Sequence, residues 1–254
     1  MFGFKPKLPL SDEDRQWVDN GFNRLSRILG RNRMLEAEII LPDAEHFPDH
    51  YDKSDSAAEK MFLRICDYMQ VDPSSIDLEI FPDETKKLSE LLPYWKGGHG
   101  GCAGAYFHPE NETKKMIVAL RHSQMEDPMS LVATIAHELG HVILLGGGLM
   151  EHSTKDMEPM TDLLTVFLGF GIFNANCASR FLQWQNNSKQ GWSMSRLGYL
   201  PEEVFSYALA KFAQERGERR PRWAAHLSTN VRSYFNKSAA WLESNEKISS
   251  QPIS

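Results

Sequence analysis

The chain has 254 residues, enough to bury a sizeable core as one large domain or as two small ones. Its composition, 41% hydrophobic and 24% charged, is ordinary for a soluble globular protein. The formal net charge of −6 argues against a general nucleic-acid-binding protein, although it leaves room for a local basic patch.

The first third of the chain is predicted to contain two helices and two short strands. Acidic residues after Ser11 begin a helix that runs to about residue 29, and a second apolar helical pattern covers residues 54–69. Short strands are expected at residues 38–41 and 76–81. The glycine-rich stretch up to Gly104 lacks the Gly-Lys-Ser/Thr ending of a phosphate-binding loop, so we interpret it as a flexible turn.

A hairpin is predicted next. Residues 105–108 and 115–121 are rich in strand-forming side chains and flank the turn-forming residues 109–113. The second strand leads directly into the segment that carries the most informative motif of the chain.

That motif is the sequence H-E-x-x-H from His137 to His141. Positions i and i+4 stack on one face of a helix, so His137 and His141 can present two imidazole nitrogens to one metal ion. Glu138 borders the same open coordination position, where a carboxylate can take a proton from an activated water. Structural zinc sites are closed and usually contain cysteine, and no cysteine is near in sequence, so the pattern favours a catalytic metal over a structural one.

The flanking residues place this motif inside a helix. Asp127 offers an N-cap oxygen, and Pro128 occupies the first helical position, where its missing N–H does no harm. Gly140 should cost about 1 kcal/mol relative to Ala, which predicts a packing constraint at that position. The glycine run 146–148 is expected to end the helix.

Two acidic residues precede the next apolar segment, residues 163–173. A carboxylate on a following helix is the expected third ligand of a catalytic two-histidine zinc site, and an acid one turn later can hold a ligand imidazole by its other nitrogen. Glu158 and Asp162 have the spacing for these two roles. Because Glu158 precedes Pro159, it should lie at the entrance of its helix, and the reverse assignment, with Asp162 as the ligand, stays open.

H-E-x-x-H followed by E-x-x-x-D on the next helix resembles the gluzincin metallopeptidases, over roughly residues 105–175. The resemblance implies a Zn²⁺ cofactor, three metal ligands, a general base and an acid that supports a ligand imidazole. The resemblance assigns His137, His141 and Glu158 as the ligands, Glu138 as the general base, and Asp162 as the acid that supports a ligand imidazole.

The resemblance also implies a zincin-like fold, in which a small mixed sheet binds the peptide substrate by adding it to an edge strand. We expect residues 116–120 to form this edge strand; a purely structural hairpin is the alternative. Metallopeptidases also need a hydrogen-bond donor that stabilises the oxyanion, and His226 and Tyr199 are the candidates for this role.

The C-terminal part of the chain is predicted to be helical. One helix should begin at Pro201 and a final helix should cover residues 223–242, with a charged connector at 216–222. The three cysteines are odd in number and far apart, which indicates a reducing compartment, the cytoplasm. The first residues lack the apolar core of a signal peptide, and no apolar run, of which 163–173 comes nearest, approaches the roughly 20 residues that span a bilayer.

The sequence therefore predicts a mainly helical α+β protein with a single zincin-like domain, residues 1–254. It would comprise an N-terminal helix at 11–29, a sheet and active-site helix at about 36–148, and a helical half at about 158–242.

The expected function is that of a soluble zinc metallopeptidase that hydrolyses peptide bonds with an activated water. The partner would be a peptide or protein substrate, with no nucleic acid and no membrane span. Two alternatives remain: a non-catalytic regulatory or binding module on a protease-like fold, and a metal-dependent amidohydrolase that acts on a non-peptide amide. The residues distinguish neither endopeptidase from exopeptidase nor one oligomeric state from another.

Overall fold

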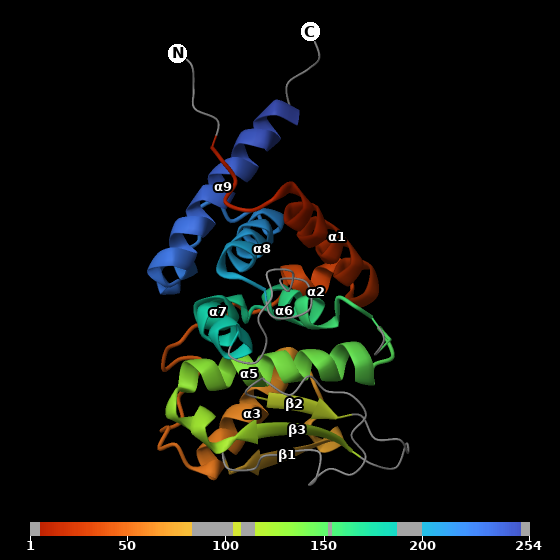
Figure 1. The fold of residues 1–254 in the computed structure, drawn as a ribbon, viewed down its shortest axis with the longest axis vertical. Helices are drawn as coiled ribbons and strands as arrows, with labels where there is room; N and C mark the ends of the chain where they lie inside the picture. Colours follow the sequence, from red (N-terminus) through yellow and green to blue (C-terminus); the bar gives the residue numbers. More distant parts are fainter. Residues whose placement is uncertain (1–5, 83–103, 108–114, 152–153, 187–199, 250–254) are drawn as a thin grey trace.

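The computed structural model describes residues 6–82, 104–107, 115–151, 154–186 and 200–249. Within these ranges the protein is mainly helical with one small mixed sheet, which confirms the predicted α+β class. Figure 1 shows helix α5 (Pro128–His141) lying between the sheet and most of the helices. A chain segment that carries the H-E-x-x-H motif thus occupies the middle of the molecule.

The two predicted N-terminal helices are confirmed. Helix α1 (Asp12–Leu29) begins after Ser11, whose side chain accepts a hydrogen bond from the Asp14 N–H, and α3 (Asp55–Met69) begins after Ser54 in the same way. These side-chain caps satisfy backbone donors that have no partner within the helix. A short helix, α2 (Arg31–Leu35), follows α1 directly.

The strand predicted at residues 38–41 is wrong. These residues pair with no strand in the described part of the chain; instead the Ile40 N–H donates to the carbonyl oxygen of Gly169 at 3.1 Å. Gly169 has a positive φ of +90°, and a Cβ there would lie 1.9 Å from the Glu38 carbonyl oxygen. The segment is therefore held against a tight turn between two helices and not beside a strand.

The sheet has the order β1-β3-β2. Strand β2 (Gly104–Phe107) pairs antiparallel with β3 (Met116–Arg121), which confirms the hairpin, and β1 (Ile76–Phe81) pairs parallel with the other side of β3. The prediction that residues 116–120 form the edge strand is wrong, because β3 is the central strand. Its consecutive buried residues Val118, Ala119 and Leu120 match a strand covered on both faces.

Helix α5 is almost entirely buried. Asp127 accepts a hydrogen bond from the Met129 N–H and Pro128 occupies the first turn, as predicted, and every residue from Leu131 to His141 is buried. A π-helical turn, Val142–Gly146, continues the helix to the predicted glycines, where Gly148 has a φ of +63°. Helices α3, α6 and α7 and strand β2 all pack against α5.

The burial of α5 bears on the question of a membrane span. In the described ranges, one helical stretch, Pro128–Gly146, is long and apolar enough by length and composition to cross a membrane. This stretch, and not the predicted run at residues 163–173, comes nearest to a membrane span. However, 78% of its most apolar 18-residue stretch is buried inside the fold. The core helix of a globular protein can have the same length and composition.

The apolar segment predicted at 163–173 is divided by Gly169 into α6 (Met157–Phe167) and α7 (Gly171–Asn186). Helix α8 (Glu202–Glu215) begins after Pro201, as predicted. The last helix, α9, covers Thr229–Ser249; its predicted start at residue 223 is wrong, because Arg222–His226 form a separate 3-10 turn with Trp223 buried.

Two of the three cysteines, Cys66 and Cys177, are buried and are not joined by a disulfide. The third, Cys102, lies outside the described residues, as do most of the glycine-rich stretch before Gly104 and the predicted hairpin turn 109–113.

Candidate metal centre

The two motif histidines are brought together by α5, as their spacing predicts. The ring centroids of His137 and His141 are 4.9 Å apart, and the rings are nearly perpendicular. Helix α6 packs closely against this turn of α5: a Cβ on Gly140 would lie 2.7 Å from the Cγ2 atom of Thr161. The predicted packing constraint at Gly140 is therefore confirmed, because a side chain there would push the two helices apart.

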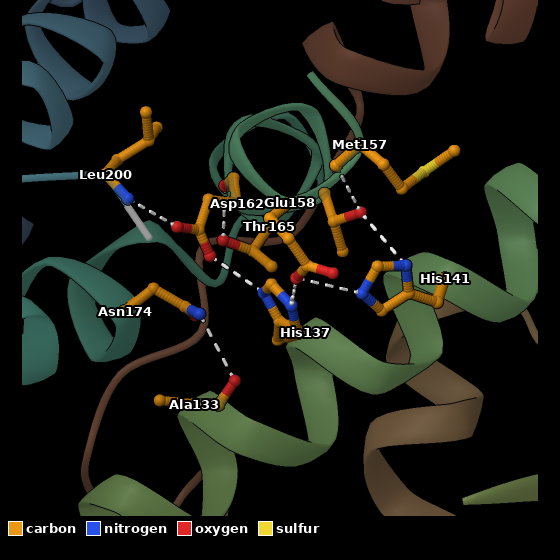
Figure 2. Close-up of polar contacts among 10 residues, drawn as sticks. Ala133, His137, His141, Met157, Glu158, Asp162, Thr165, Asn174 and Leu200 are labelled. Atoms are coloured by element: carbon orange, nitrogen blue, oxygen red, sulfur yellow. Dashed lines mark hydrogen bonds and ion pairs between the residues drawn. The ribbon is translucent and has the colours of Figure 1, made fainter. Parts of the chain in front are cut away.

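Glu158 lies in the first turn of α6, where the following Pro159 was expected to place it. Its Oε2 atom is 3.0 Å from Nε2 of His137 and 3.3 Å from Nε2 of His141. Figure 2 shows the three side chains converging, with both imidazoles directed at the same carboxylate. The ligand atoms of these three residues all lie within 4.8 Å of one another, so the group could hold a metal ion.

These donors could hold a metal ion, and their chemistry and spacing are compatible with zinc. Two imidazole nitrogens and one carboxylate oxygen form a common catalytic zinc ligand set. Bonds of about 2.0–2.1 Å in tetrahedral geometry separate two ligand atoms by about 3.3 Å. The two Nε2–Oε2 distances, 3.0 and 3.3 Å, lie close to that separation.

Asp162 contacts His137 from the opposite side of the ring. Its Oδ1 atom is 2.8 Å from Nδ1 of His137, and its Oδ2 atom accepts a hydrogen bond of 2.7 Å from the backbone N–H of Leu200. The carboxylate is fully buried. Figure 2 shows it between His137 and Leu200. Asp162 therefore links a motif histidine to the segment that enters α8, while Glu158 faces the nitrogens on the other side of the imidazoles.

The centre gathers the carboxyl groups of Glu138, Glu158 and Asp162 around two buried imidazoles. Burial alone would lower the pKa of His137, but its hydrogen bonds to Asp162 and Glu158 outweigh burial and raise the pKa well above its usual value. Burial alone would raise the pKa of Glu158. Its hydrogen bonds with both histidines outweigh burial and hold the pKa of this carboxyl well below its usual range. Two of these carboxyl groups, Glu138 and Asp162, are buried, and a bound cation would compensate their negative charge.

Glu138 is 3% exposed, directly follows His137 in the chain and does not belong to the three-residue ligand group. Burial raises the pKa of its carboxyl, an effect that His137 and His141 oppose. A carboxylate next to the ligands, and not among them, is what a general base requires.

Other contacts at this site were not anticipated from the sequence. The Asn174 side chain on α7 donates a hydrogen bond of 3.2 Å to the carbonyl oxygen of Ala133, one turn before His137 (Figure 2). Thr161 contacts His141, and the Leu200 N–H contacts Asp162. Threonine, asparagine and a backbone amide occur throughout any chain, so no sequence pattern indicated these three contacts.

Of the two candidate oxyanion donors, only His226 lies in the described part of the chain. Tyr199 lies outside the described residues. His226 is exposed in the 3-10 turn before α9, and its backbone carbonyl accepts a hydrogen bond of 2.9 Å from Asn176. That hydrogen bond holds the turn against α7. It uses the backbone of His226 and therefore does not support a catalytic role for the imidazole.

The comparisons with known proteins gave no significant match to a family model, a curated protein or a solved structure. The candidate centre therefore depends on its own geometry and on the motif spacing.

Proposed function

We propose that this protein is a zinc-dependent metallopeptidase of gluzincin type. The observation that carries the proposal is the contact of both Nε2 atoms with one Glu158 carboxylate oxygen, at 3.0 and 3.3 Å, on a helix turn that also carries the buried Glu138. The resemblance of H-E-x-x-H and E-x-x-x-D to the gluzincin pattern supports the same assignment.

In this proposal His137, His141 and Glu158 hold the ion. Bound zinc would supply a Lewis acid that polarises the scissile carbonyl and makes water more acidic. Glu138 accepts a proton from the attacking water, whose oxygen bonds to the carbonyl carbon, and delivers the proton to the amine as the C–N bond breaks. The products are a carboxylic acid and an amine, so atoms and protons balance.

Asp162 has a positioning role. A carboxylate can only accept from the Nδ1–H of His137, so in the metal-bound form the lone pair of that ring would be on Nε2, directed at the ligand group. The same carboxylate holds the Leu200 N–H, so the orientation of His137 is tied to the start of the α8 segment.

Metal removal tests the function. The zinc-loaded protein is expected to cleave a mixed peptide pool, 1,10-phenanthroline should lower the rate by at least about a hundredfold, and added zinc should restore it. The non-chelating 1,7-isomer is the control for effects of the compound itself. Hydrolysis that persists without metal would contradict the proposal. Cleavage of a non-peptide amide alone would favour an amidohydrolase, and bound zinc with no hydrolysis would favour a binding module.

The ranking of the two acids tests the ligand assignment. We expect Glu158→Gln to reduce zinc affinity severely, because its oxygen faces both Nε2 atoms. Asp162→Asn should cost about 10- to 100-fold, the usual effect of losing a partner of a ligand imidazole. Competition with a chromophoric chelator measures both. The opposite ranking would show that the two acids have exchanged roles.

A further inference from the structure

Thr161 lies between the backbone of α6 and the second motif histidine. Its side chain is fully buried, and its hydroxyl donates a hydrogen bond of 2.9 Å to the carbonyl oxygen of Met157. The same Oγ1 atom is 3.4 Å from Nδ1 of His141. A carbonyl oxygen can only accept, so the single hydroxyl proton is directed at Met157 and Oγ1 must act as acceptor toward the imidazole.

This direction fixes the tautomer of His141. If Oγ1 accepts, Nδ1 carries a proton, so in the neutral ring that would bind a metal the lone pair is on Nε2, the atom that faces Glu158. Neutral imidazole with a free Nε2 is the form that binds a metal. Asp162 produces the same result for His137, with a charged acceptor at the shorter distance of 2.8 Å.

The methyl group of Thr161 has a separate contact. Its Cγ2 atom is the nearest atom to the position that a Cβ on Gly140 would occupy, at 2.7 Å. The methyl therefore packs on the α5 backbone one residue before His141, and a β-branched side chain in a helix has few rotamers. The hydroxyl and the methyl can thus be tested independently.

We propose that Thr161 is the positioning residue of His141: its hydroxyl fixes the tautomer with Nε2 free for the metal, and its methyl sets the distance between α5 and α6. This inference rests on the proposed metal centre. The two motif histidines are then supported unequally, His137 by an anion and His141 by a neutral hydroxyl.

Two substitutions separate the two groups of this side chain. Thr161→Val keeps the shape and the methyl contact but presents no acceptor to Nδ1, so zinc affinity should fall by about 10-fold, the low end for the loss of such a partner. Thr161→Ser keeps the acceptor and removes the methyl, so zinc affinity should stay close to that of the wild type while the metal-free protein melts at a lower temperature. Chelator competition and thermal unfolding in EDTA measure these effects.

A second pair and a second readout exclude a purely structural effect. Thr161→Ala and Thr161→Ser differ only in the hydroxyl, so the alanine variant should bind zinc about 10-fold more weakly than the serine variant, even if the valine variant does not fold. The visible absorption of bound Co²⁺ should change in the valine and alanine variants and not in the serine variant.

Equal zinc affinity in wild type, Thr161→Val and Thr161→Ser would overturn the role of Thr161 and leave the metal centre standing. An equal loss of zinc affinity in the valine and serine variants would also overturn the role of Thr161. The shape of the side chain, and not its hydroxyl, would then determine the affinity. A wild-type protein that binds no zinc would overturn the metal centre and this inference together.

Discussion

Glu138→Gln is expected to leave folding and zinc content unchanged and to lower the hydrolysis of a permissive peptide pool by at least about a hundredfold, the typical scale for the loss of a general base. Glutamine has nearly the shape of glutamate, which matters for a side chain that is only 3% exposed. Its amide cannot take a proton from water. Glu138 lies outside the three-residue ligand group, so the metal should remain bound.

The comparison must be made at equal zinc occupancy, because loss of metal would give the same drop in rate. Glu126→Gln is a matched control: Glu126 is an exposed carboxylate paired with Lys53, and its substitution should leave the rate unchanged. If wild type and Glu138→Gln cleave the same substrate at equal rates, Glu138 is not the base and the proposed mechanism is wrong.

The helices near the motif could be predicted because their signals are local. Ser11, Ser54 and Asp127 each accept a hydrogen bond from the backbone two or three residues ahead, so the start of each helix is encoded within one turn. The placement of His137 beside His141 follows in the same way from helical periodicity.

The errors concern contacts between distant parts of the chain. The central position of β3 depends on the parallel pairing of Ile76–Phe81, and nothing within residues 116–120 indicates a second neighbour. Residues 38–41 have the composition of a strand, but the Ile40 N–H donates to the carbonyl oxygen of Gly169 in a turn between two helices. Such outcomes are decided by packing and not by local propensity.

The candidate centre likewise combines residues predicted from local spacing with contacts that depend on the packing of distant segments. The spacing of His137, Glu138 and His141 predicted their roles directly, whereas the sequence favoured Glu158 as the third ligand and left the reverse assignment, with Asp162, open. The packing of α6 on α5 directs Glu158 to the Nε2 atoms and Asp162 to an Nδ1 atom. The Thr161 contact depends on the same packing, which the sequence could not specify.

The substitutions with the largest expected effect on the metal itself are His137→Ala and His141→Ala. Each removes one of the three side chains whose ligand atoms lie within 4.8 Å of one another and leaves an incomplete set. We expect either variant to lose zinc binding altogether. His226→Ala is the matched control, because His226 is exposed in the 3-10 turn before α9 and should not affect zinc content.

The amount of zinc in the purified wild-type protein tests the metal centre most directly. Elemental analysis should find about one equivalent of zinc per chain, which disappears in His137→Ala and persists in His226→Ala. Absence of any transition metal, both in the native protein and after zinc supplementation, would contradict the proposed centre.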